Sequence, residues 1–81
     1  MCLAIPGKVT RVFSESNILM ARVDFDGIAK SVCIEHVPTA EPGDYVLVHV
    51  GFAIAKIDEQ EALKLLEYFR NLKQADGEVF G

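Results

Sequence analysis

Apolar and polar residues alternate over much of the first 57 positions, and this period of two predicts β-strands buried on one face. Residues 18–25 show the pattern most clearly, with apolar side chains on one face and charged side chains on the other. The Asp26-Gly27 pair that follows is a strong signal for a tight turn. We therefore predict a β-hairpin with a return strand over residues 28–34. The residues expected on its buried face are Ala21, Val23, Phe25, Ile28, Val32 and Ile34.

Three further strands are predicted, over residues 7–13, 45–50 and 52–57. A Pro6-Gly7 turn signal precedes the first of them, and a polar connection over residues 14–17 follows it. The segment 45–50 consists almost entirely of β-formers, which is typical of a central strand, and Gly51 permits a bend before the last strand. Five short strands with a meandering start favour a mainly β fold, a small, partly open five-stranded β-barrel of the oligonucleotide/oligosaccharide-binding (OB) type.

The period of the pattern changes after Asp58, where apolar residues recur at helical spacing on one stripe. The stripe consists of Ala62, Leu65, Leu66, Phe69 and Leu72. Asp58 is suited to cap the start of this helix, and Glu61 three residues later completes a capping-box pattern. We expect a single domain, with the barrel over residues 1–57, the helix over 58–74 and a mobile tail over 75–81.

Composition limits the class of protein. A chain of 81 residues, 51% of them hydrophobic, has enough apolar surface for one core. A net charge of −4 and eight scattered basic residues argue against nucleic acid as a partner. No apolar run approaches the ~20 residues that span a bilayer, and no secretory leader is evident. Two cysteines make no disulfide framework, so we expect a cytoplasmic protein with reduced thiols.

Four residues are candidates for chemistry. Removal of the initiator Met1 would leave Cys2 with both a thiol and a free amine, although Cys2 also fits the start of the first strand. His49 lies within an apolar strand, on the face of Tyr45 and Leu47, where a core role and a functional role are both open. Cys33 is expected to be a small buried hydrophobe. His36 follows at a spacing that permits chelation, but this set does not match paired zinc-ligand spacing.

Three blocks of sequence carry a close resemblance to a known family. They are residues 1–9 (MCLAIPGKV), 23–27 (VDFDG) and 43–54 (GDYVLVHVGFAI), followed by the helix opening at 58–62 (DEQEA). In this order they resemble the HypC family, the small chaperones that assemble nickel–iron hydrogenases. The resemblance covers nearly the whole chain, and it implies a small barrel with a C-terminal helix.

The resemblance also implies a function and a cargo. Members of this family form a complex with an iron–sulfur scaffold protein, on which an iron bearing two cyanides and one carbon monoxide, Fe(CN)2CO, is assembled. The chaperone then engages the precursor of the hydrogenase large subunit and helps to transfer the iron. It acts as a carrier and not as an enzyme, and it holds the iron only transiently, shared with its partner.

The resemblance assigns site residues as well. Cys2 matches the family's essential cysteine, and a thiolate is a soft ligand suited to such iron. His49 matches a functional histidine that is either a second ligand or a partner of the thiol. Pro6 and Gly7 are expected to set the geometry of the N-terminal segment.

The high apolar content predicts an exposed apolar patch beside Cys2 that binds both partners in turn. The residues expected in partner binding are Cys2, Leu3, Pro6, Gly7, His49 and Phe52. Two alternatives come from other classes of protein. An N-terminal cysteine can serve as the nucleophile of an enzyme, and a small barrel can bind single-stranded nucleic acid when aromatic side chains line a basic groove.

Overall fold

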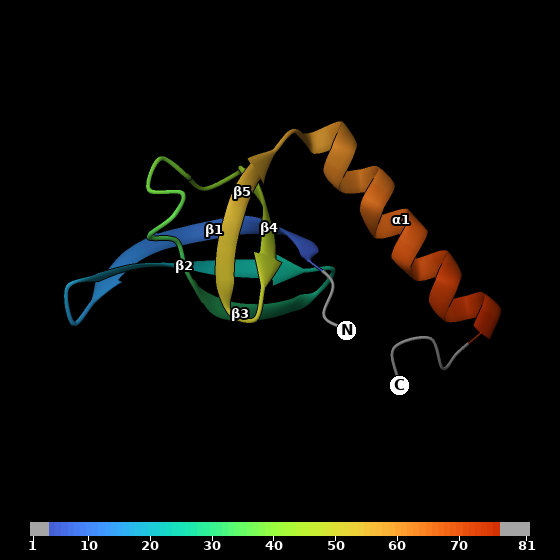
Figure 1. Ribbon diagram of the computed structural model, residues 1–81, viewed down its shortest axis with the longest axis horizontal. Coiled ribbons are helices and arrows are strands. Elements are labelled where there is room, and N and C mark those ends of the chain that lie inside the picture. Colours follow the sequence, from blue (N-terminus) through green and yellow to red (C-terminus); the bar gives the residue numbers. More distant parts are fainter. Residues whose placement is uncertain (1–3, 77–81) are drawn as a thin grey trace.

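Five strands and one helix form the described part of the chain, residues 4–76 of a computed structural model, with side chains described over residues 4–71. The elements are β1 (Ile5–Glu15), β2 (Ile18–Phe25), β3 (Ile28–Cys33), β4 (Tyr45–His49), β5 (Phe52–Ile57) and α1 (Glu59–Asp76) (Figure 1). The predicted mainly β fold with a C-terminal helix is confirmed. The predicted bounds of β2 and β5 match the structure at both ends.

The strands close into a barrel in the order β1-β2-β3-β5-β4. Neighbouring strands are antiparallel except at the β3–β5 seam, where the strands are parallel and only Cys33 and Phe52 pair. The predicted central strand, β4, lies between β1 and β5, as expected. The barrel is therefore closed, but its narrow seam leaves the first part of β3 without a partner on that side.

The first hairpin is longer than the sequence pattern predicts. β1 and β2 pair as far as Glu15 and Ile18, so half of the predicted polar connection is strand. The turn consists only of Ser16 and Asn17, with φ angles of 51° and 65°. Such left-handed pairs match the twist of a two-residue hairpin, and this geometry lets the polar residues before the turn remain in the ladder.

The Pro6-Gly7 pair is strand and not the predicted turn. These residues pair with Leu47 and Val46 of β4, and both are buried. A Cβ atom on Gly7 would clash with Val23 and lie 2.8 Å from the Phe25 ring. Glycine is therefore required here because β2 packs directly against the backbone of β1.

The core lies inside the barrel and is built from small and medium apolar side chains. Its buried members are Val9, Ala21, Val23, Val32, Ile34, Ala40, Val46, Val48 and Ala53. Two expectations about β3 were wrong. Ile28 is 62% exposed, because no strand covers the first part of β3. Cys33 is half-buried and not buried, because it lies on the outer side of the wall at the seam.

The helix starts as the sequence predicts. The backbone N–H of Glu61 donates a 2.8 Å hydrogen bond to the Asp58 carboxylate, the contact expected of an N-cap. Ala62 is fully buried, and α1 packs against β1 and β4. The helix ends at Asp76, two residues beyond the predicted end, and the rest of the predicted tail lies outside the described residues. Within the part of the chain that the structure describes, no helix has the length and apolar content to cross a membrane.

An ion pair ties the helix to the far end of the β2–β3 hairpin. The Arg70 guanidinium donates hydrogen bonds from Nε and Nη2 to the two carboxylate oxygens of Asp26, each 2.8 Å long. These hydrogen bonds hold the pKa of Asp26 below its ordinary value. The pair therefore joins α1 to a turn more than forty positions earlier in the chain.

We expect Arg70→Gln to lower the free energy of unfolding slightly at pH 7, since the pair is exposed. The pKa of Asp26 is lower in the folded state, so the stabilisation is present above the unfolded pKa of about 4. This stabilisation is lost as the pH falls through the lowered pKa of Asp26 in the folded state. Urea titrations between neutral and acidic pH would measure this, with Lys64→Gln on the same helix as control. If Arg70→Gln remained less stable than the unmodified chain at acidic pH, the ion pair with Asp26 would not be the cause.

Candidate functional site

The pairing of β1 with β4 places His49 beside the N-terminal segment. The two strands are antiparallel and Ile5 pairs with Val48. Ala4, one residue before Ile5, is therefore opposite His49 in the register. Cys2 and Leu3 lie outside the described residues. The functional histidine expected from the resemblance is thus level with a residue two positions from Cys2, a proximity that spacing along the sequence does not reveal.

A row of paired residues continues from His49 across the barrel wall. His49 pairs with Phe52 on β5, Phe52 with Cys33 on β3, and Cys33 with Met20 on β2. His49 is half-buried, whereas Phe52 is 48% exposed and lies with its ring centroid 6.3 Å from that of His36. Phe52 thus has His49 as its pairing partner on β4 and His36 in ring contact.

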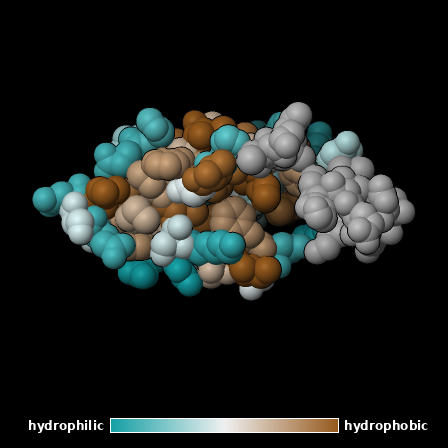
Figure 2. Space-filling model, turned by 60° about the horizontal axis from the view of Figure 1, so that its bottom comes forward, coloured by the Kyte–Doolittle hydropathy of each residue, from teal (hydrophilic) through white to brown (hydrophobic). Residues whose placement is uncertain are grey.

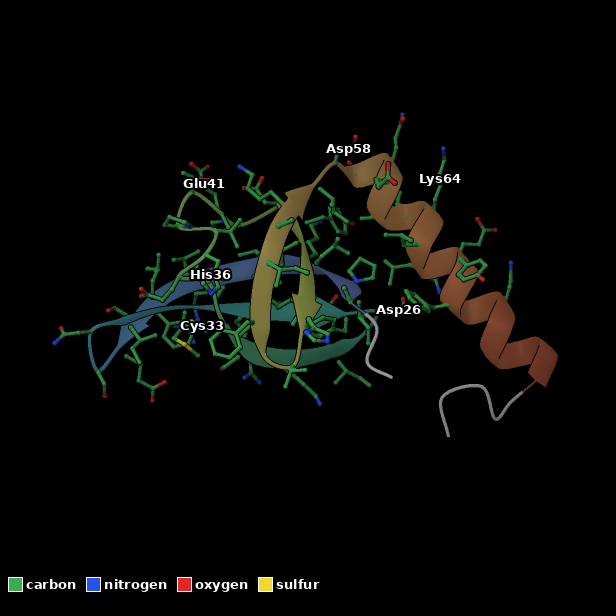
Figure 3. All side chains as sticks on the ribbon, in the orientation of Figure 1. Asp26, Cys33, His36, Glu41, Asp58 and Lys64 are labelled. Atoms are coloured by element: carbon green, nitrogen blue, oxygen red, sulfur yellow. The ribbon has the colours of Figure 1, made fainter. Side chains whose placement is uncertain are left out.

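Cys33 is separated from the N-terminal segment by β4 and β5 along this row. Adjacent strands are about 4.8 Å apart, so the path from Ala4 to Cys33 along the curved wall crosses three spacings, about 14 Å, and the direct distance is shorter. Figure 3 shows Cys33 and His36 across the β4–β5 hairpin from the start of β1. Within residues 4–71, no three His, Cys, Asp or Glu side chains come together in a group that could hold a metal ion.

Apolar side chains are exposed around the start of β1, where a patch was predicted. Ile5 is 45% exposed, and Val50 in the β4–β5 turn is 70% exposed. Phe52 is a surface residue and not part of the core. By contrast, Pro6 and Gly7 are both buried, so neither is part of the exposed apolar surface of the described residues.

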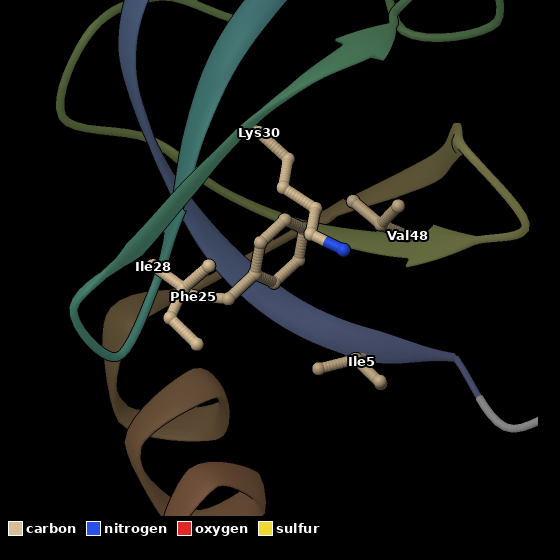
Figure 4. A pocket seen from close by; sticks show the side chains of 5 residues that line it. All are labelled: Ile5, Phe25, Ile28, Lys30 and Val48. Carbon is tan, nitrogen blue, oxygen red and sulfur yellow. The ribbon is translucent and has the colours of Figure 1, made fainter.

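A hollow of about 260 Å³ opens at this end of the barrel. We call it the barrel-end hollow, and it is lined by Ile5, Phe25, Ile28, Lys30 and Val48 (Figure 4). Figure 2 shows apolar side chains gathered over the middle of one face of the molecule, with hydrophilic ones around its edge. The hollow exists because β3 pairs with β5 only at Cys33, the last residue of β3. The inward side of the first residues of β3 is therefore uncovered.

None of the five residues that line the hollow is among the site residues predicted from the sequence. A signal for Lys30 was present, because strict alternation puts this lysine on the same face as Ile28 and Val32. A lysine on the inward face of a strand indicates that part of that face is open to solvent.

Comparison with known proteins identifies relatives of the chain. A sequence model of the HupF/HypC family matches residues 1–69, which include all five strands and more than half of α1. The hydrogenase maturation factor HypC of Synechocystis sp. is 46% identical over 68 residues, covering 82% of this chain and 90% of that protein.

Two further relatives are similar over nearly their whole length. The hydrogenase maturation factor HypC of Rhizobium leguminosarum bv. viciae is 42% identical over 76 residues, covering 94% of this chain and 97% of that protein. The hydrogenase maturation factor HybG of Escherichia coli is 40% identical over 76 residues, covering 89% of this chain and 92% of that protein.

Proposed function

The chain belongs to the HupF/HypC family, and we propose from this that it is a chaperone of nickel–iron hydrogenase maturation. It carries the Fe(CN)2CO group from an iron–sulfur scaffold protein to the precursor of the hydrogenase large subunit. This takes place in the cytoplasm, and the chain acts as a carrier and not as an enzyme. The observation that carries the proposal is the β1–β4 register, which supports a joint role for Cys2 and His49.

The chemistry of these two residues suits a carrier. A thiolate is a soft ligand for an iron that already has strong-field carbon ligands. An imidazole close to the thiol either accepts its proton or provides a second ligand. Since only one or two ligands come from this chain, the iron group can be surrendered to the next protein, which a closed structural site does not allow.

Co-expression with the iron–sulfur scaffold protein tests the proposal. We expect the purified complex to contain iron and to show infrared bands from two cyanides and one carbon monoxide. A complex that forms without these bands, in cells that mature hydrogenase, would contradict the carrier role. Failure to form any complex with the scaffold would contradict the proposed partner.

The exposed apolar residues near β1 support sequential use of one surface. Ile5, Val50 and Phe52 occupy the same end of the barrel as the N-terminal segment, so a partner that reaches Cys2 covers them as well. The scaffold and the large-subunit precursor should therefore exclude each other. In competition pull-downs, increasing amounts of precursor should release the scaffold, and a stable ternary complex would contradict this arrangement.

We predict that His49→Ala reduces iron transfer by about 10- to 100-fold, the range found when a group that orients a metal ligand is removed. His49 is half-buried on the outer side of β4, so the free energy of unfolding should fall much less. Iron transfer to the precursor, measured by infrared bands, and urea unfolding would be compared. Tyr45→Ala, on the same face of β4, is the control. A His49 variant that transfers iron normally would refute the role.

A further inference from the structure

The barrel-end hollow is apolar on most of its wall and carries one cation. Ile5, Phe25, Ile28 and Val48 contribute apolar side chains from four strands. Figure 4 shows the Lys30 side chain extending from β3 into the space between Phe25 and Val48. The hollow thus offers an apolar site with a positive charge at its margin.

The ammonium group of Lys30 has no carboxylate partner among the described side chains, although two aspartates are close in sequence. A carboxylate oxygen of Asp24 accepts the backbone N–H of Gly27, within the turn. The carboxylate of Asp26 is paired with Arg70. Over residues 4–71 the ion pairs are those of Arg70 with Asp26 and of Lys56 with Asp44. The charge of Lys30 is therefore available to a binding partner.

We propose that this hollow anchors a protein partner of the carrier. It takes one large apolar side chain of the partner, and Lys30 pairs with a carboxylate on a residue next to that side chain. This inference rests on the proposed function and deepens it, because it states the chemistry by which a partner segment is recognised.

Size and charge support this occupant. A volume of about 260 Å³ is below the range of about 300–1,000 Å³ typical of small-molecule sites, and it fits a single aromatic or branched side chain. The chain has twelve acidic and eight basic residues, so an acidic partner segment is repelled by most of the surface and attracted at Lys30. Two copies of this chain, each with a net charge of −4, repel each other.

The position of the hollow also supports a protein partner. Ile5 belongs both to the hollow and to the exposed apolar surface at the start of β1. A partner segment anchored in the hollow lies beside the strand that leads to Cys2. Anchoring therefore orients the partner toward the end of the chain that the proposed function uses.

Short capped peptides and the isotope-labelled 81-residue chain test the proposal. The first peptide carries a glutamate next to a phenylalanine, and matched peptides carry lysine in place of glutamate or alanine in place of phenylalanine. We expect the first peptide to shift the amide resonances of the hollow residues in NMR spectra. The alanine peptide should cause no such shifts. The lysine peptide should bind about 2- to 5-fold more weakly, the range of one exposed ion pair.

Two variants locate the site. Ile28→Asp should abolish binding of the glutamate–phenylalanine peptide, whereas Ile18→Asp should leave it unchanged. The pair is matched because each isoleucine is exposed and is the first strand residue after a two-residue turn. Lys30→Gln should remove the preference for the glutamate peptide over the lysine peptide. Shifts that fall outside the hollow, or equal binding of these two peptides to the unmodified chain, would overturn the proposal.

The same NMR spectra would identify other occupants of the hollow. Shifts of the hollow residues on raising the protein concentration alone would identify a second copy. Shifts of the same residues on deleting residues 77–81 would identify that segment of the chain. Either result would overturn the assignment to a partner. If peptides do not bind but the scaffold complex still carries iron, the hollow inference fails alone. If peptides bind but no iron is carried, the proposed function fails.

Discussion

Cys2→Ala is expected to reduce the iron content of the scaffold complex to background while the barrel remains folded. The thiol is the soft ligand that the proposed carrier role requires, and alanine provides no ligand. The described pairing of β1 with β4 begins at Ile5, three residues after the substitution. Iron analysis and infrared spectra of the co-purified complex would measure the loss, with circular dichroism as the check on folding.

Cys33→Ala is the matched control for the thiol. Cys33 is half-buried at the β3–β5 seam, and β4 and β5 separate it from Ala4 along the barrel wall, so we expect it not to share the role of Cys2. Its replacement should cost about 1 kcal/mol of stability, as is common for such sites, and leave iron loading intact. Loss of maturation in a stably folded Cys33 variant would show that the roles of the two cysteines are wrongly assigned.

Gly7→Ala is expected to destabilise the barrel by about 1–3 kcal/mol, the usual cost of overpacking. The added methyl group would overlap the Phe25 ring and Val23, and Val23 is fully buried in the core. Since Phe25 also lines the barrel-end hollow, the variant should change the shape of that hollow. Urea unfolding would measure the stability, and peptide binding would report on the hollow.

Ala29→Val provides the control for Gly7→Ala. Ala29 is an exposed strand residue on β3, so it gains apolar atoms without entering the core. Its stability should stay within about 0.5 kcal/mol of the unmodified chain, as is usual for surface positions. A Gly7→Ala variant as stable as this control would contradict the close packing of β2 against β1.

The regular parts of the fold could be predicted because local pattern and tertiary burial agree in them. Ala21 and Val23 alternate with charged residues and are buried as the pattern requires. Asp58 caps the helix in the place where its sequence motif puts it. Pro6 and Gly7 show the opposite case, since their local preference for a turn is overridden by pairing with β4 and packing against β2.

The candidate site depends on pairings that no local pattern contains. His49 is brought to the N-terminal segment by the β1–β4 register, and the family resemblance indicated its role without indicating this geometry. Alternation assigns Ile28 and Lys30 to the inward face, but it does not reveal that β5 meets β3 at one pair only. The hollow follows from that seam, so it could be found only from the arrangement of the strands.

In the proposed function, the few residues between Cys2 and the paired part of β1 act as a short tether for the cargo. Ile5 is already held in the barrel wall, and a chain extends by at most about 3.6 Å per residue, so the Cys2 α-carbon stays within about 7 Å of that of Ala4. Once a partner docks on this end of the barrel, so short a tether gives the thiol a high effective concentration at the partner's site. Hand-over of the iron group then depends on which protein occupies the docking surface, and lengthening the tether by inserted glycines should slow transfer without weakening docking.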